Sequence, residues 1–249
     1  MKRTLLIASL LGATALQAAK PNIIFILADD MGYGDVQALN PKSKIPTPHL
    51  NRLAKQGMTF TDAHSPSGVC TPTRYGVITG RYCWRSRLKR GVLGGYSAPL
   101  IEKDRPTVGS ALQKAGYHTA AIGKWHLGMN MTRREGGKPS KDRRDGDGNV
   151  DFTKPIADSP ITRGFHEYFG VSASLDMAPY VWIENNHFVK ARLVQQPAVK
   201  FPGYVRQGPR AADLKFEEGL DVLAERAAGF LKRMAKQDKP FFLYLPLTG

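Results

Sequence analysis

Near its start the chain carries an uninterrupted apolar run that ends in two carboxylates, Asn22-Ile23-Ile24-Phe25-Ile26-Leu27-Ala28-Asp29-Asp30. An apolar run of this length without alternation is typical of a strand that is buried on both faces of a parallel sheet. In such sheets, ligands bind beyond the carboxyl ends of the strands. The run therefore predicts a fully buried parallel strand over 22–28, with functional side chains at Asp29 and Asp30.

Strand-like and helix-like segments alternate along the rest of the chain. The predicted strands cover 22–28, 58–62, 117–122 and 240–247, and the predicted helices cover 47–56, 72–79, 106–115 and 216–236. Gly57 and Gly116 stand where two helical patterns stop, as helix-terminating glycines do. This alternation favours a mainly parallel sheet with helices on both faces. We therefore predict an α/β fold, specifically an α/β/α sandwich.

Length and composition are those of one globular domain. The chain has 249 residues, of which 42% are hydrophobic, enough for one substantial core. The net charge of +15 is compatible with polyanionic ligands and equally with a merely solvated basic surface. No interleaving of aromatic and basic residues accompanies this charge, so we expect no nucleic-acid partner.

The N-terminus has the pattern of a secretory signal peptide. Met1-Lys2-Arg3 precedes an apolar run over 5–16, and Ala18-Ala19 follows as a cleavage region. The run is too short to span a bilayer stably. We predict a signal peptide over 1–19, no stable membrane insertion, and an exported protein that is periplasmic or secreted.

A second informative stretch is Gly68-Val69-Cys70-Thr71-Pro72-Thr73-Arg74-Tyr75-Gly76-Val77-Ile78-Thr79-Gly80-Arg81. Pro72 suits the first position of a helix, which makes Thr71 the expected N-cap and puts Cys70 just outside. Arg74 would then reach back over a helix mouth that attracts anions. Cys70 is therefore a candidate nucleophile. The alternatives are a small buried cysteine and a disulfide between Cys70 and Cys83.

A third stretch, Gly116-Tyr117-His118-Thr119-Ala120-Ala121-Ile122-Gly123-Lys124-Trp125-His126, completes a set of motifs in a fixed order. With residues 21–35 and the Cys-x-Pro-x-Arg pattern from Cys70 to Arg74, it resembles the type I sulfatases. The resemblance covers nearly everything after the first twenty residues. It implies an alkaline-phosphatase-like fold, with residues 20–249 as the N-terminal portion of a sulfatase catalytic domain.

The resemblance implies a specific chemistry at Cys70. In this family the corresponding cysteine is oxidised after synthesis to formylglycine, whose hydrate attacks sulfur and later expels sulfate by returning to the aldehyde. Asp29, Asp30 and the formylglycine at Cys70 are implied to be Ca²⁺ ligands, whereas Asp35 is not assigned to the metal. Oxygen ligands of this kind suit a hard cation.

The resemblance also implies roles for the polar residues around this group. Arg74 would hold the formylglycine, and Lys124 would contact the sulfate. His126 would hydrogen-bond the hydrate and help to remove its second proton. Ser174 corresponds to a substrate-contacting serine, although this chain has Leu175 where family members often have histidine.

The implied function is hydrolysis of a sulfate monoester, either an aryl sulfate or a sulfated carbohydrate, with a formylglycine-generating maturation enzyme as a further partner. Cys83 would then remain a free or buried thiol. One alternative is a phosphate or phosphonate ester hydrolase on the same fold. Another is an inactive exported remnant that binds sulfated glycans through its basic face.

Two further patterns bear on metal binding and on the extent of the chain. Asp145-Gly146-Asp147-Gly148-Asn149-Val150-Asp151 resembles a calcium loop, but Val150 stands where the turn needs glycine, so we predict only a polar turn within a long loop over 130–160. After the last predicted strand, sulfatases continue with a histidine, an Asp-Asn pair and a lysine. The chain ends at Gly249 without them, so we expect a C-terminally truncated domain.

Overall fold

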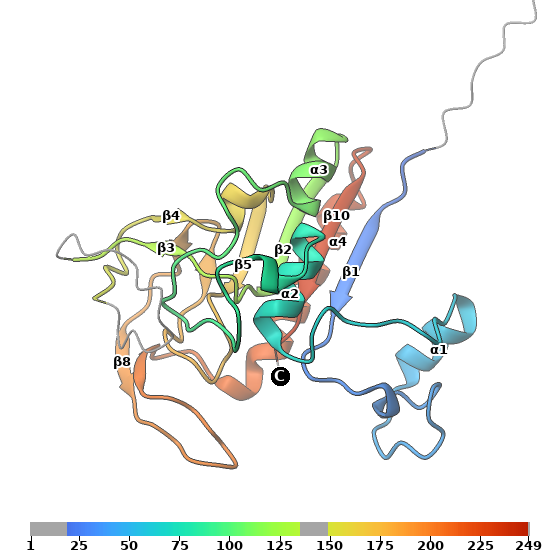
Figure 1. Cartoon of the computed structure of the whole chain (residues 1–249), viewed down its shortest axis with the longest axis horizontal. Coiled ribbons are helices and arrows are strands. Elements are labelled where there is room, and N and C mark those ends of the chain that lie inside the picture. The colour runs from blue at the N-terminus through green and yellow to red at the C-terminus, as the bar shows by residue number, and fades with distance from the viewer. Residues whose placement is uncertain (1–18, 135–148, 249) are drawn as a thin grey trace, which may run out of the picture.

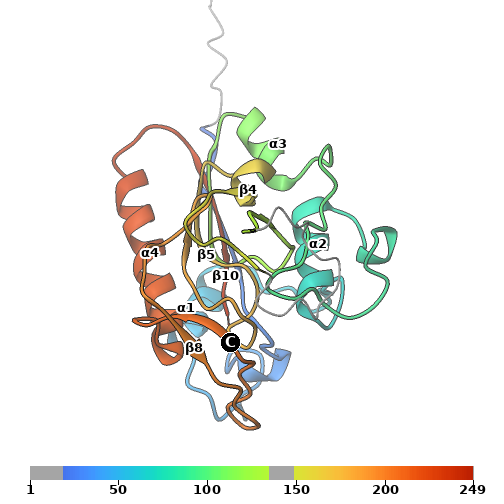
Figure 2. The same cartoon turned by 90° about the vertical axis from the view of Figure 1, so that its left-hand side faces the viewer.

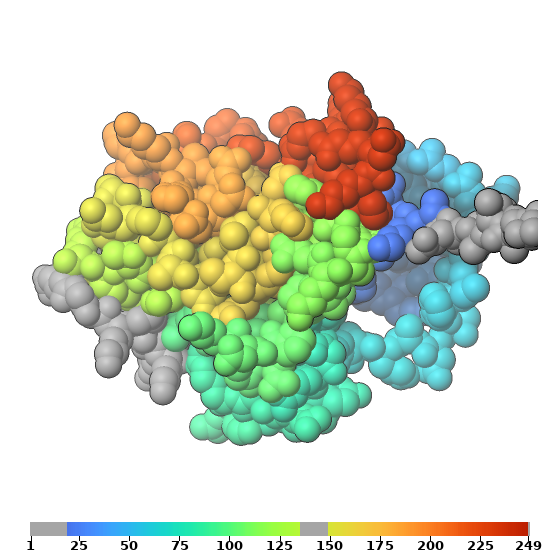
Figure 3. All heavy atoms as spheres, turned by 90° about the horizontal axis from the view of Figure 1, so that it is seen from above, coloured from blue at the N-terminus to red at the C-terminus, as the bar shows by residue number. Residues whose placement is uncertain are grey.

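A computed structural model describes residues 19–134 and 149–248. A central sheet separates two layers of helix, with α2 (Cys70–Thr79) and α3 (Val108–Lys114) on one face and α4 (Gly219–Met234) on the other (Figure 2). The predicted α/β/α sandwich is confirmed. Residues 30–60, including α1 (Pro48–Gln56), lie beyond one edge of this sheet (Figures 1 and 3).

The central sheet has six strands in the order β1-β10-β2-β5-β6-β7. Their bounds are Ile23–Leu27 for β1, Phe241–Pro246 for β10, His118–Lys124 for β2, Glu167–Val171 for β5, Ile183–Glu184 for β6 and His187–Phe188 for β7. The first four strands pair in parallel, and β6 and β7 continue the sheet as antiparallel strands. The parallel strands therefore present their carboxyl ends at the same edge.

Two small sheets and four short helices complete the described chain. The strands are β3 (Asn130–Met131) with β4 (Ile156–Asp158), and β8 (Leu193–Gln196) with β9 (Gly208–Ala211). The 3-10 helices cover Tyr33–Asp35, Cys83–Arg85, Pro160–Arg163 and Phe216–Glu218. The loop predicted over 130–160 thus contains β3 and β4, and most of the polar turn predicted over 145–151 lies outside the described residues.

The central strands bury both faces because their side chains alternate between two cores. Ala120 and Ile122 of β2 pack with α4 residues such as Phe230, whereas Ala121 packs on the opposite side with Tyr75 of α2. The two cores lock β2 in register between β10 and β5. The strand carries this register to its carboxyl end at Lys124.

β1 departs from the sequence prediction. It was predicted as a fully buried strand, but it is the edge strand of the sheet, and Ile24, Phe25 and Ile26 are exposed. Its hydrogen-bonded neighbour is β10, and within the described residues no second strand pairs with it. Its apolar composition is that of a central strand, and its position is that of an edge.

The strand predicted over 58–62 is also wrong. The structure assigns no strand there, and Met58 and Phe60 are exposed. Alternating apolar side chains favour a strand only where a neighbouring strand accepts the backbone hydrogen bonds, and none of the described sheets includes this segment.

The described ranges contain no helix with the length and apolar composition needed to cross a membrane. The signal peptide predicted over 1–19 falls, apart from its last residue, outside the described residues and stays a prediction.

Candidate active site

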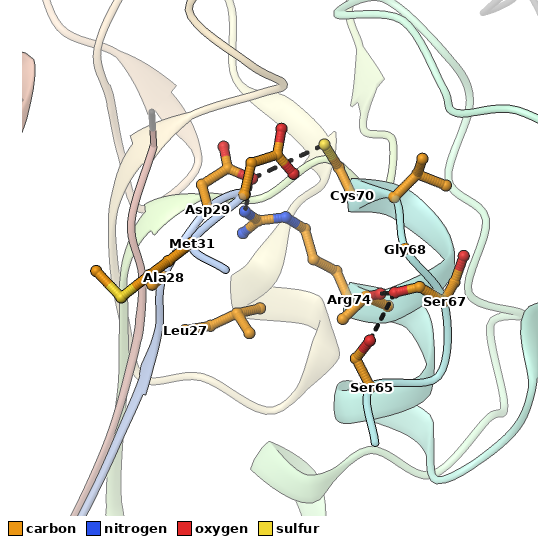
Figure 4. A pocket seen from close by; sticks show the side chains of 12 residues that line it. Leu27, Ala28, Asp29, Met31, Ser65, Ser67, Gly68, Cys70 and Arg74 are labelled. Carbon is orange, nitrogen blue, oxygen red and sulfur yellow. Dashed lines mark hydrogen bonds and ion pairs between the residues drawn. The ribbon is translucent and has the colours of Figure 1, made fainter. Parts of the chain in front are cut away.

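The carboxyl ends of β1 and β2 meet the start of α2 at one point. Figure 4 shows Asp29, at the end of β1, facing Cys70 and Arg74 of α2. The strand ends and the helix start come from segments that are far apart in the sequence and are joined by the parallel sheet. The apolar run that predicted β1 therefore does position its terminal carboxylates at a site.

Cys70 is the first residue of α2, with Val69 as the N-cap, whereas the sequence predicted Thr71 as the cap and Cys70 outside the helix. Thr71 is fully buried, and its hydroxyl donates to the carbonyl of His126 (3.0 Å) while accepting from the N–H of Leu93 (3.2 Å). Because those contacts occupy the Thr71 hydroxyl, it does not cap the helix. The Cys70 side chain lies at the positive end of the helix dipole.

Lys124 joins the three candidate groups around it. Its ammonium nitrogen lies 2.6 Å from Asp29 Oδ2, 3.1 Å from Ser174 Oγ and 3.3 Å from Cys70 Sγ. These contacts match the three donors of an ammonium group. Its side chain is only 1% exposed, so the structure holds a buried cation against the sulfur.

Arg74 ties the ends of three strands together. One of its terminal nitrogens donates to the carbonyl of Lys124 (2.8 Å), and the other contacts the carbonyl of Leu247 (3.2 Å) and Asp29 Oδ1 (3.4 Å). The planar guanidinium with its several fixed donors suits this arrangement better than a lysine would. Asp29 thus lies between two buried cations.

His126 is fully buried and is held by two hydrogen bonds. Its N–H donates to the carbonyl of Ser172 (3.0 Å), and its ring Nε2 lies 2.8 Å from the carbonyl oxygen of Leu93. A carbonyl only accepts, so Nε2 carries the proton and Nδ1 presents its lone pair. Among the described residues, Nδ1 has no hydrogen-bond partner. Burial, and next the neighbouring Lys124 charge, lower the pKa of His126 from 6.5 to about 3, so the ring is neutral.

Two glycines permit the close approach of strands beneath Lys124. A Cβ added to Gly170 of β5 would lie 1.8 Å from the carbonyl oxygen of Gly123, and one added to Gly123 would lie 1.9 Å from that of Pro246. Gly123 also has a φ of +136°, which side chains rarely adopt. Neither position accepts a larger residue without moving the strand that carries Lys124.

The donor set at the end of β1 fits a hard cation in part. One ligand atom from each of Asp29, Asp30 and Cys70 lies within 4.8 Å of the others. The two carboxylates supply the oxygen ligands that Ca²⁺ prefers, but a thiol is a soft ligand. With an oxygen in place of the sulfur at position 70, all three ligand atoms of the group would be of the kind that a hard cation prefers.

These residues open into a cavity of about 1040 Å³ lined by Cys70, Lys124, His126 and Ser174, among others. A second pocket of about 270 Å³ lies between the end of β1 and the start of α2 (Figure 4). The structure thus brings together all the predicted site residues. The alternative disulfide is absent, because Cys70 and Cys83 are both free, with Cys83 buried.

The large cavity also reaches residues that the sequence motifs did not indicate. Tyr204 and Arg206 line it together with Asp176. They lie in the segment between β8 and β9, which has no recognisable motif. An aromatic and a basic residue just before a short strand, as Tyr204 and Arg206 are before β9, occur in so many sequences that they do not identify a site.

A family model described as Sulfatase matches residues 21–249. An N-acetylgalactosamine-6-O-sulfatase of Bacteroides thetaiotaomicron is 31% identical over 260 residues, which cover 91% of this chain and 47% of the relative. Human arylsulfatase A is 34% identical over 253 residues, which cover 97% of this chain and 43% of the relative. The chain therefore spans about half the length of these curated relatives.

Solved structures share the fold. One, whose description concerns the metabolism of multiple glycosaminoglycans by Bacteroides thetaiotaomicron, is 30% identical, with a TM-score of 0.75 over 92% of this chain and 51% of that one. Another, Ps i-CgsB in complex with k-i-k-neocarrahexaose, is 25% identical, with a TM-score of 0.62 over 92% of this chain and 45% of that one.

Proposed function

The chain belongs to the sulfatase family, with its alkaline-phosphatase-like fold, and on this basis we propose that it hydrolyses sulfate monoesters at Cys70. The observation that supports this most directly is the contact of Lys124 with Cys70 Sγ and Ser174 Oγ at the buried end of β2. A sulfate group bound at residue 70 would lie beside this ammonium and would compete with Cys70 and Ser174 for its N–H donors. Positive charge held in a fixed position stabilises the charge on sulfuryl oxygens.

Cys70 is proposed to act after oxidation to formylglycine. When present, this group supplies a hydroxyl nucleophile from its hydrate and releases sulfate by returning to the aldehyde, which an unmodified thiol cannot do. Arg74, which contacts Asp29 and the backbone of Lys124, orients the surrounding charges. Ser174 is proposed to contact the sulfate together with Lys124.

His126 is proposed as the proton acceptor at residue 70. Its ring is neutral, and the hydrogen bond from Nε2 to Leu93 leaves Nδ1 as the basic atom. His126 lines the same cavity as Cys70. The lone pair on Nδ1 can accept a hydrogen bond from the hydrate, and because the pKa of the ring is about 3, His126 would assist proton removal as a weak base.

Calcium is the proposed metal of the site. Asp29, Asp30 and the formylglycine oxygen at position 70 would hold it, and the ion would add positive charge beside the sulfuryl oxygens. The two carboxylates alone leave a Ca²⁺ ion short of the six to eight oxygens it takes. Further oxygen ligands are therefore needed to complete a Ca²⁺ site.

The substrate class is proposed to be a sulfated small molecule or glycan. The named relatives include enzymes for a sulfated amino sugar and for aryl sulfates, so both classes are represented among them. We also propose that a maturation enzyme generates the formylglycine at Cys70 and that the protein is exported from the cytoplasm.

The test is hydrolysis by the full chain produced together with a maturation enzyme, with the oxidation state of residue 70 read by peptide mass spectrometry. Sulfate esters of phenols and sugars should be cleaved faster than the matching phosphate esters. Cys70→Ala should abolish this activity, whereas Cys83→Ala, which also removes a thiol, should retain it. Activity that persists in Cys70→Ala, or a verified formylglycine protein that cleaves no sulfate ester, would refute the proposal.

A further inference from the structure

Three charged or aromatic side chains that line the large cavity come from two segments outside the three motifs. Tyr204 and Arg206 belong to the segment between β8 and β9, and Asp176 follows the end of β5. In Figure 1 the segment between β8 and β9, in orange, lies at the end of the molecule toward which β1 points. We refer to Asp176, Tyr204 and Arg206 together as the ledge.

The ledge is anchored to the protein core through Arg206. The Arg206 N–H donates to the carbonyl of Asp176 (3.1 Å), and the Arg206 carbonyl accepts from the hydroxyl of Tyr180 (2.7 Å). Tyr180 is fully buried, so its hydroxyl provides a fixed point. Val199 and Val205 close the adjoining loop with a pair of backbone hydrogen bonds of 2.7 and 2.9 Å.

The side chains of the ledge are arranged for contact with a ligand. The Arg206 guanidinium forms an ion pair with Asp176 (3.2 Å) and lies 5.8 Å from the ring centroid of Tyr204. Tyr204 is 55% exposed, and the side chains of Arg206 and Asp176 are 30% and 27% exposed. An aromatic face, a planar donor and a carboxylate acceptor are thus presented together at the wall of the cavity.

The three side chains of the ledge suit some leaving groups of a sulfate ester better than others. An aryl group is best held in an enclosed apolar pocket, and the ledge is polar and open. A second anionic group would find the Arg206 charge already paired with Asp176. A neutral sugar ring fits better: vicinal hydroxyls can accept from the guanidinium and donate to the carboxylate, and the apolar face of the ring can lie on Tyr204.

We propose that Asp176, Tyr204 and Arg206 form a carbohydrate subsite that holds the sugar ring of a sulfated saccharide while its sulfate occupies the site at Cys70 and Lys124. This inference rests on the proposed sulfatase function and specifies the substrate class. The cavity volume of about 1040 Å³ is ample for a saccharide beyond the sulfate group.

The test measures binding in a Cys70→Ala background, which prevents turnover, by calorimetry with two probes, N-acetylgalactosamine 6-sulfate and phenyl sulfate. The quantity compared is the ratio of the two dissociation constants. Tyr204→Ala and Arg206→Ala should each shift this ratio about tenfold against the sugar, as expected for loss of a charged hydrogen bond or a stacking face. Arg206→Lys should not restore it, because lysine lacks the planar fork.

Phe201→Ala is the matched control. Phe201 lies on the same loop as Tyr204 and is 88% exposed, but it does not line the cavity. Its substitution should leave the ratio unchanged. A ratio that is unchanged in Tyr204→Ala and Arg206→Ala, with both probes still bound, would overturn the subsite alone. If the Cys70→Ala protein with an intact ledge bound neither probe, both the sulfatase proposal and the subsite would be overturned.

Discussion

Lowering the pH from 7 to 5 is expected to destabilise the fold through one buried side chain, His126. Its ring is fully buried, and burial together with the Lys124 charge lowers its pKa from 6.5 to about 3. The folded chain therefore keeps this ring neutral at pH 5, whereas the unfolded chain protonates it. Proton binding to the unfolded state favours unfolding. The contribution of the neutral ring to the free energy of unfolding is therefore fully present above pH 6.5 and is lost as the pH falls toward 3.

The size of the effect follows from the shift. Each pH unit below the unfolded pKa costs about 1.4 kcal/mol, so the free energy of unfolding should fall by about 2 kcal/mol from pH 7 to pH 5 through this residue alone. Urea unfolding of the metal-free chain at both pH values measures the total change. The His126→Asn variant isolates the residue, since asparagine tolerates the positive φ of +55° and does not titrate.

The result that would refute this reasoning is an equal loss of stability in both proteins. Other groups that titrate in this range are common to wild type and variant, so they cancel in the comparison. NMR supplies a second measurement that does not depend on the variant: the ring carbons of His126 should keep their neutral chemical shifts down to pH 5. A change in those shifts near pH 6.5 would contradict the assigned burial.

Three further predictions concern packing, metal and thiols. Gly170→Ala should destabilise the chain by more than about 4 kcal/mol, because its Cβ would lie 1.8 Å from the Gly123 carbonyl oxygen. Gly229→Ala, in an open position of α4, should instead stabilise it by about 0.5–1 kcal/mol. Urea unfolding measures both changes, and changes of the same sign and size would contradict the steric explanation. Ca²⁺ at one hundred times its Kd should raise the free energy of unfolding of the formylglycine form by about 2.7 kcal/mol, which a rise in Tm would report. An unchanged response in Asp30→Asn would exclude this residue as a ligand. In the unmodified chain, Cys83 should react with an alkylating reagent only after denaturation, and rapid labelling of the native protein would show that it is accessible.

The sequence predicted those parts of the fold that local patterns determine. The apolar runs of β2 and β10 and the helical period of α4 identified the central sheet and one covering layer, since these elements pack on several neighbours. The segment at 58–62 has the same local preference as a strand but lacks a partner strand, and local preference cannot reveal a missing partner. For the same reason the edge position of β1 was not predictable, because strand order depends on long-range pairing.

The site was predictable as a set of residues but not as an arrangement. Three motifs indicated Asp29, Cys70 and Lys124, but the ion pair from Lys124 to Asp29 joins residues 95 positions apart. The position of Cys70 inside α2 depends on the buried contacts of Thr71, which draw its hydroxyl away from the helix end. Tyr204 and Arg206 had no local signal at all, because only the folded chain brings their loop to the cavity.

The contacts of Arg74 also determine when, during folding, the site can exist. Its guanidinium contacts residues 45, 50 and 173 positions away along the chain. Closing the longest of these loops is entropically costly and requires β10, the strand inserted between β1 and β2. A nascent chain still lacking β10 would have neither a continuous sheet nor the last carbonyl partner of Arg74. The full set of Arg74 contacts is therefore expected to form only after β10 has paired with β1 and β2, and to be lost when β10 detaches.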